Sequence, residues 1–97
     1  MIIRKPIEFL WDEGNQQKNW LKHKVKTKEC EEVFLDDQKK IAKDKFHSKS
    51  EPRFILLGKT KKMRLIYLIF TTRSKKIRVI SARDINKKER KLYEKTT

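Results

Sequence analysis

Two arginines in the last apolar stretch of the chain are the strongest candidates for chemistry. Arg78 lies inside the segment Ile77–Arg83 and Arg83 closes it. An arginine guanidinium presents a fixed fork of donors that matches two oxygens of a phosphate group. We therefore expect both side chains to bind a phosphate-bearing ligand. The alternative for Arg78 is a structural ion pair with a buried acid such as Asp12, because an unpaired guanidinium is costly to bury.

A histidine is the first candidate for proton transfer. His23 falls at the end of a predicted helix, where the helix dipole favours a cation, and histidine changes charge close to neutral pH. Capping of the helix end is the alternative role for His23. His47, in an expected exposed loop, is a weaker candidate.

If the phosphate-bearing ligand is an RNA that the chain also cuts, cleavage without a metal ion requires three groups. A base deprotonates the ribose 2′-OH, cations stabilise the charged phosphorane, and an acid protonates the leaving oxygen. The sequence has no clustered carboxylates or histidines of the kind that hold Mg²⁺ or Zn²⁺. The cationic route is therefore the better fit, and we expect no cofactor.

Several other side chains are candidates for contacts with RNA. Arginines at the starts of predicted strands line a groove or, alternatively, a solvated strand edge. An aromatic residue near a helix end stacks on a base or supplies a proton, although core packing is more typical there. The expected RNA-binding residues are Arg53, Arg64, Arg73, Lys22 and Tyr93.

The charge of the chain points to a polyanionic partner. The 97 residues carry a net charge of +14, and residues 59–97 alone hold 14 basic and 3 acidic side chains, a net charge of +11. Such a one-sided charge indicates nucleic acid or an acidic protein as partner, with solvated lysines as the alternative. Cys30 is the only cysteine, which excludes a disulfide framework and favours a small core residue. No apolar run exceeds six residues, so we expect a cytoplasmic protein without a membrane span.

Hydrophobic patterning predicts one small α+β domain over residues 1–97, with helices packed on one face of an antiparallel sheet. Asp12 is a good N-cap for the first helix, Thr27 for the second and Asn86, in a capping box with Glu89, for the third. The predicted helices are Glu13–His23, Lys28–Leu35 and Lys87–Lys95. The predicted strands are Pro6–Trp11, a short edge strand near Ile41–Lys45, and a meander of Glu51–Gly58, Arg64–Thr71 and Ile77–Arg83.

Motifs along most of the chain resemble those of the BrnT family of type II toxins. Trp11-Asp12, Asn19, Lys22-His23 and Val25 are similar to that family's opening WDxxKxxxNxxKHGV. His47, Glu51, Arg53 and Gly58 resemble its H…ExR…G segment. Phe70–Arg73, Ile77–Arg83, Glu89-Arg90 and Tyr93 resemble its closing FTxR…IRIISAR…ER..Y.

Two positions depart from the pattern of this family. Asn15 stands where the family usually has lysine, which removes a cation from the first helix. Lys24 stands where the family has glycine, so a non-glycine residue occupies an expected position of positive φ, at a cost of about 1 kcal/mol.

The resemblance implies a RelE-like ribonuclease toxin. It also implies a cognate antitoxin that binds DNA, expected to be a ribbon-helix-helix protein, and a toxin–antitoxin heterotetramer. Two other functions remain open at this point. One is a non-catalytic nucleic-acid-binding module, although the strands lack the paired exposed aromatics of an RNA-recognition sheet. The other is an inactive toxin homologue, which the Asn15 departure makes plausible.

Overall fold

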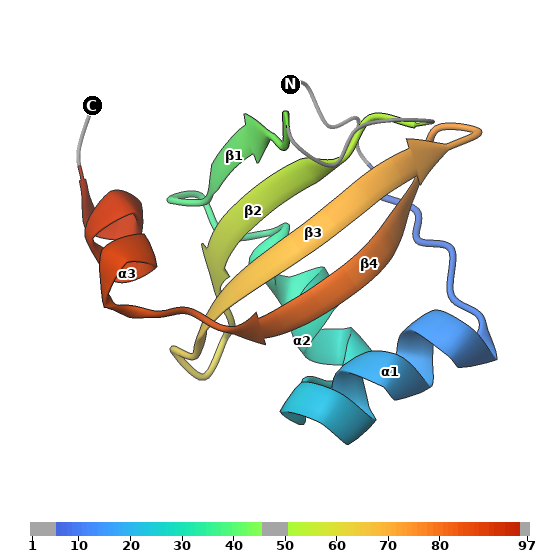
Figure 1. Cartoon of the computed structure of the whole chain (residues 1–97), viewed down its shortest axis with the longest axis horizontal. Helices are drawn as coiled ribbons and strands as arrows, with labels where there is room; N and C mark the ends of the chain where they lie inside the picture. The colour runs from blue at the N-terminus through green and yellow to red at the C-terminus, as the bar shows by residue number, and fades with distance from the viewer. Residues whose placement is uncertain (1–5, 46–50, 96–97) are drawn as a thin grey trace.

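The computed structural model describes residues 6–45 and 51–95, except the side chains of residues 17–21. His47 and the loop at 47–50 therefore lie outside the described residues. The described part is a four-stranded antiparallel sheet with three helices (Figure 1). Its elements are α1 (Glu13–His23), α2 (Thr27–Val33), β1 (Lys40–Lys43), β2 (Phe54–Lys59), β3 (Leu65–Arg73), β4 (Lys76–Asp84) and α3 (Lys87–Glu94).

The sheet follows the chain in the order β1-β2-β3-β4, and every neighbouring pair is antiparallel. This arrangement confirms the predicted α+β class, the meander and the edge strand before it. Short turns between β-branched and aromatic runs produce this topology, because antiparallel neighbours need only a few connecting residues. Ser74 and Lys75, in the turn between β3 and β4, adopt the positive φ angles that so tight a connection demands.

The predicted N-terminal strand is reduced to one bridge. Phe9 pairs in parallel with Ile77, and the amide of Leu10 donates to the Ile77 carbonyl over 2.8 Å. The side-chain amide of Asn15 then donates to the Leu10 carbonyl over 3.1 Å. The backbone amide of Asp12 also donates to the Asn15 side-chain oxygen over 2.8 Å, and the backbone amide of Asn15 donates to the Asp12 carboxylate over 2.9 Å, in a reciprocal cap that starts α1. The chain therefore leaves β4 after one pairing, and Asp12 is confirmed as the N-cap.

The main core lies between the sheet and the first two helices. Phe34 and Phe70 meet edge to face with ring centroids 5.0 Å apart, within a cluster that includes the buried Cys30. Burial raises the pKa of the Cys30 thiol to about 12, which confirms a core residue. Gly58 permits the close approach of α2, since a Cβ there would lie 2.8 Å from the Val33 Cβ.

The second helix begins one residue earlier than predicted. Lys26, not Thr27, is its N-cap, and the backbone amide of Lys26 donates to the Glu29 carboxylate over 3.0 Å. No side-chain cap comes from the N-cap residue itself. A carboxylate three positions into the helix therefore marks its start, where the sequence suggested a threonine hydroxyl.

The prediction that all helices pack on one face is wrong for α3. Tyr93 packs with Leu57 and Leu65 in a second cluster, separate from the main core. Strand residues alternate between the faces of a sheet, so the Leu57 side chain points away from that of Leu56, which belongs to the main core. Figure 1 accordingly shows α3 apart from α1 and α2. We call the two sides the α1–α2 face and the α3 face.

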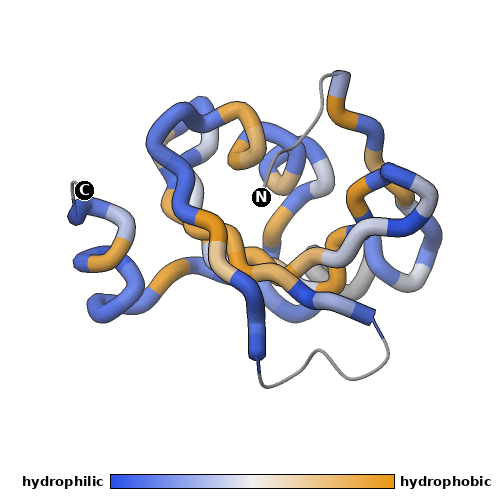
Figure 2. Tube along the Cα trace, turned by 90° about the horizontal axis from the view of Figure 1, so that it is seen from above, coloured by the Kyte–Doolittle hydropathy of each residue, from blue (hydrophilic) through white to orange (hydrophobic). Residues whose placement is uncertain are grey.

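The last helix buries little apolar surface. Asn86 and Glu89 form the predicted capping box, with hydrogen bonds of 2.8 and 3.0 Å. Tyr93 is buried, which fits its core-packing alternative, whereas Leu92 remains 58% exposed. Figure 2 shows α3, beside the C-terminus, as a largely hydrophilic helix with only a short hydrophobic stretch. The helix is thus fastened to the sheet through few apolar contacts.

Candidate functional site

A β-bulge places the two candidate arginines on the same face of the sheet. Residues five positions apart in a regular strand point to opposite faces. The pairing of β3 with β4 shifts between Ile69 and Phe70, which leaves Ile80 as an extra residue. Arg78 consequently pairs with Thr71 and Arg83 with Tyr67, two β3 residues on the α3 face. The bulge therefore aligns both guanidinium-bearing side chains along one side of β4.

The structure brings three of the predicted site residues together in one pocket. Lys22 and His23 at the end of α1 meet Arg83 at the end of β4 around a pocket of about 400 Å³. Its remaining wall consists of Tyr67, Ile69, Ser81 and Ala82. One imidazole and two cationic side chains therefore border a hollow whose volume lies within the usual range of small-molecule sites.

Arg83 is held by a carboxylate and an aromatic ring. Its two terminal nitrogens donate to the two oxygens of Glu89 over 2.9 and 2.7 Å. Its Cζ lies 4.0 Å from the centroid of the Tyr67 ring, in cation–π geometry. The Glu89 carboxylate raises the pKa of Arg83. Burial opposes the charge of Glu89, but the hydrogen bonds from Arg83 and from the Asn86 amide outweigh it and lower the pKa of Glu89.

Sequence analysis missed Tyr67 as a site residue. It lies in the apolar run Leu65–Phe70, where the pattern predicts that an aromatic residue belongs to the core. Strand alternation was the available signal, because it separates Tyr67 from Ile66 and Leu68 and places it on the other face. Burial raises the pKa of Tyr67, an effect only partly opposed by Arg83, so the phenol stays protonated at neutral pH.

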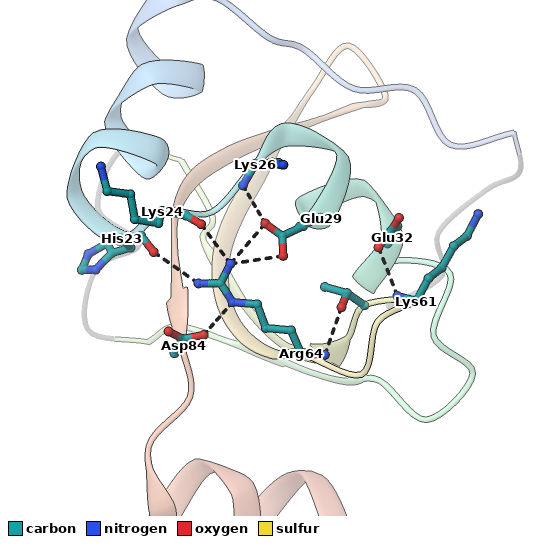
Figure 3. Close-up of polar contacts among 9 residues, drawn as sticks. His23, Lys24, Lys26, Glu29, Glu32, Lys61, Arg64 and Asp84 are labelled. Carbon is teal, nitrogen blue, oxygen red and sulfur yellow. Dashed lines mark hydrogen bonds and ion pairs between the residues drawn. The ribbon is translucent and has the colours of Figure 1, made fainter.

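Arg64 fastens the end of α1 to the sheet (Figure 3). Its Nε donates to Asp84 over 2.7 Å, and its Nη1 donates to both oxygens of Glu29 over 3.1 Å. Its guanidinium also reaches the main-chain carbonyls of Lys24, over 2.9 Å, and His23, over 3.2 Å. Figure 3 shows the His23 carbonyl directed at Arg64 and the imidazole directed away from it. Arg64 thus positions the helix end that carries His23, and its donors are engaged within the protein.

The two departures from the family pattern have distinct structural outcomes. Lys24 has a φ of 55°, which confirms the expected left-handed conformation of a non-glycine residue. Asn15 is buried, and its side-chain amide donates to the Val79 carbonyl over 3.2 Å as well as to Leu10. Asn15 therefore tethers α1 to β4 at the position where the family usually has a lysine.

Arg78 belongs to a second charged cluster, at the opposite end of β4. Its Nη1 donates to Asp12 over 2.8 Å, the ion pair considered as its alternative role, although Asp12 is exposed. Hydrogen bonds from the Asn15 backbone and from Arg78 lower the pKa of Asp12. Arg73 makes a bidentate pair with Glu51, at 2.8 and 3.1 Å, which lowers the pKa of Glu51. Arg78 does not line the His23 pocket, and the strand places it roughly 15 Å from Arg83.

Tyr93 is occupied inside the protein. Its hydroxyl donates to the Asp36 carboxylate over 2.6 Å, and the Lys59 ammonium lies 5.7 Å from its ring centroid. Burial and the Asp36 charge raise the pKa of Tyr93. The core-packing alternative therefore describes Tyr93 in this structure.

Within the residues that the structure describes, no group of three or more His, Cys, Asp or Glu residues is arranged to hold a metal ion. None of the helices in the described ranges is long and apolar enough to cross a membrane.

The fold and the pocket define a small, strongly basic α+β domain with a cationic site at the end of its last strand. Residues 11–89 match the model of the family described as "Ribonuclease toxin, BrnT, of type II toxin-antitoxin system". Because this match covers most of the 97 residues, the chain belongs to the BrnT family of ribonuclease toxins of type II toxin–antitoxin systems. The resemblance read from the motifs is thereby confirmed. No curated protein sequence matches the chain.

Proposed function

We propose that this protein is an active, metal-independent endoribonuclease that inhibits translation by cutting RNA in the His23 pocket. The observation that carries the proposal is the convergence of His23, Lys22 and Arg83 on one pocket. Three residues predicted separately from the sequence border the same hollow. A non-catalytic binding module does not require a histidine at a helix end that Arg64 fixes through main-chain carbonyls.

Each pocket residue has a role in this reaction. Arg83, supported by the Tyr67 ring, binds the scissile phosphate and stabilises the additional negative charge of the phosphorane. The ribose 2′-oxygen attacks phosphorus, the bond to the 5′-oxygen breaks, and the products are a 2′,3′-cyclic phosphate and a 5′-hydroxyl. His23 transfers a proton in one of these steps, and Lys22 adds a second cation at the rim.

The Arg78 cluster extends the RNA contact along β4. Arg78 and Arg73 both lie at the end of the sheet opposite the pocket, and Arg53 immediately precedes β2 close to Glu51, the partner of Arg73. Arginines paired with exposed carboxylates exchange these partners for phosphate at low cost, because exposed pairs contribute little stability. We assign these three arginines to the phosphates that flank the cut. We leave Arg64 and Tyr93 out of the proposed surface, since both make hydrogen bonds to other parts of the protein.

The proposal includes the regulation that accompanies such toxins. A cognate, DNA-binding antitoxin of the ribbon-helix-helix type neutralises the enzyme in the cytoplasm, and the two proteins form a heterotetramer. The net charge of +14 favours both an RNA substrate and an acidic protein partner.

The decisive experiment compares matched arginine variants. Purified protein is incubated with a long single-stranded RNA in EDTA, beside Arg83→Met and Arg90→Met variants purified identically. Arg90 is exposed on α3 and lies outside the pocket lining. Cleavage by the unmodified protein and by Arg90→Met, with loss of cleavage in a folded Arg83→Met, supports the proposal. Equal cleavage by all three preparations indicates a contaminating nuclease, and no cleavage by any of them favours the binding module or an inactive homologue.

A further inference from the structure

A groove with a mainly apolar lining lies beside α3. It has a volume of about 410 Å³ and lies between α3 and the α3 face of β1, β2 and β3. Its floor and walls are mainly apolar, and a lysine stands at each of its two sides, on β1 and at the end of α3. The lining consists of Lys40, Ile41, Ala42, Ile55, Leu57, Tyr67, Glu89, Leu92 and Lys95.

The groove is open because α3 covers the sheet incompletely. Leu92 is 58% exposed, although it stands next to the buried Tyr93 on the same helix. Ala42 is also exposed on the edge strand β1, opposite Ile55. An exposed leucine above a half-buried apolar strand surface is unfavourable in water and is typical of a surface that a partner covers.

The charges around the groove select the kind of partner. Lys40 and Lys95 line it, and its one acid, Glu89, is already paired with Arg83. The chain as a whole carries +14. A partner segment with apolar side chains in the groove and carboxylates over the lysines satisfies both features. An RNA strand fits poorly, because its charged phosphates gain no favourable contacts from the apolar residues that line the groove.

We propose that this groove is the docking surface for the antitoxin, which inserts an acidic amphipathic segment between α3 and the sheet. The inference rests on the proposed function, since it assigns a position to the partner named there. Leu92 and Ala42 supply the exposed apolar contacts, and Lys40 and Lys95 pair with acidic residues of the segment.

A segment bound in the groove affects the His23 pocket through two residues, Tyr67 and Glu89. Tyr67 lines both hollows, and Glu89 lines the groove while holding Arg83. A segment packed on Tyr67 and Glu89 keeps α3 in place and keeps the carboxylate on the arginine. The antitoxin therefore neutralises the enzyme from the groove, without entering the pocket itself.

The test uses two groove variants and one matched control. Leu92→Glu and Ala42→Glu place a carboxylate in the groove from opposite sides, at exposed positions that tolerate it. Leu35→Glu is the control, because Leu35 is 60% exposed and lies outside the groove lining. The probe is the purified antitoxin encoded beside the toxin gene, titrated calorimetrically against each folded toxin. Circular dichroism checks the folding of each variant.

A loss of affinity of more than about tenfold for Leu92→Glu and Ala42→Glu, with Leu35→Glu unchanged, is expected. Unchanged affinity in both groove variants, or an equal loss in the control, overturns the proposal. A dimer of the unmodified chain that Leu92→Glu dissociates overturns it in favour of self-association. RNA cleavage by the unmodified toxin and by each variant is measured in parallel without antitoxin. If the unmodified toxin does not cleave RNA, the proposed function is refuted. The antitoxin affinities still show whether the groove is the docking surface.

Discussion

The guanidinium of Arg83 lies over the ring of Tyr67, with its Cζ 4.0 Å from the ring centroid, while both its terminal nitrogens bind Glu89. The arginine is thereby fixed from below by an aromatic face and from the side by a helix. In the proposed reaction RNA replaces the carboxylate and leaves the aromatic support in place. This distinction between a permanent and an exchangeable partner leads to the first two predictions.

Tyr67→Leu is expected to weaken RNA binding by about two- to fivefold, because an exposed cation–π contact contributes about 0.5–1 kcal/mol. Tyr67→Phe keeps the ring and should retain full binding and cleavage. Fluorescence anisotropy with a nuclease-resistant RNA measures the affinity, and gel assays measure the cleavage. A large loss of cleavage in Tyr67→Phe would contradict the supporting role, since it would assign proton transfer to the hydroxyl.

Glu89→Gln is expected to bind nuclease-resistant RNA about two- to fivefold more tightly, because a partly exposed ion pair that competes with phosphate contributes at most about 1 kcal/mol. Glutamine preserves the capping box with Asn86, so α3 remains intact. Glu94→Gln removes the same charge from an exposed position of the same helix and serves as the control. If both variants gain affinity equally, the effect is one of net charge and Glu89 does not compete for Arg83.

Arg64→Met is expected to lower the free energy of unfolding by about 2 kcal/mol, since it leaves Glu29 and two carbonyls without a charged donor. Lys62→Met, an exposed change on the same hairpin, should stay within about 0.5 kcal/mol. Urea denaturation measures both. Arg64→Met should also lower kcat at saturating RNA, because the end of α1 loses its anchor. Unchanged stability and kcat would show that the clamp does not position His23.

The Asp36–Tyr93 hydrogen bond predicts how stability depends on pH. Burial alone would raise the pKa of Asp36, but hydrogen bonds from Tyr93 and from the amides of Gln38 and Lys59 lower it below its usual 3.8. The unfolded chain then binds the proton more readily, so this stabilisation is present above pH 3.8 and is lost as the pH falls through the lowered pKa. The raised pKa of Tyr93 acts in the other direction: its stabilisation is complete below pH 10.0 and is lost as the pH rises further.

Urea denaturation across this range compares the unmodified protein with Tyr93→Phe. The phenylalanine variant is expected to be less stable at neutral pH and to show a smaller decline above pH 10.0. Parallel pH profiles for the two proteins would contradict this assignment.

Patterns of neighbouring residues predicted much of this structure. Alternating and continuous apolar runs indicated the meander, and local caps at Asp12 and Asn86 indicated where two helices begin. These features depend on contacts between residues close in sequence. The single bridge at Phe9 depends instead on Asn15, whose amide reaches the Leu10 and Val79 carbonyls and turns the chain into α1.

The candidate site was predictable in its residue types but not in its grouping. His23 and Arg83 were chosen for their chemistry, whereas their meeting in one pocket depends on the position of α1 against the edge of β4. Arg64 has the same residue type as Arg83, yet it binds carbonyls and carboxylates inside the protein. The surface of the α3 face was not predicted. Tyr67 lies within a continuous apolar run, and Leu92 is an apolar residue next to Tyr93, so both have the sequence context of core residues.

Both edge strands of the sheet have features that disfavour pairing with another chain. An uncovered strand edge offers hydrogen bonds to any other chain and is a common starting point for aggregation. At one edge, β1 spans only four residues and carries a lysine at each end. At the other, the bulge at Ile80 interrupts β4 and residues 8–10 occupy its hydrogen bonds at Ile77. The described part of the sheet thus lacks the long, regular edges from which fibres grow, and the open apolar groove offers side-chain contacts to a partner instead.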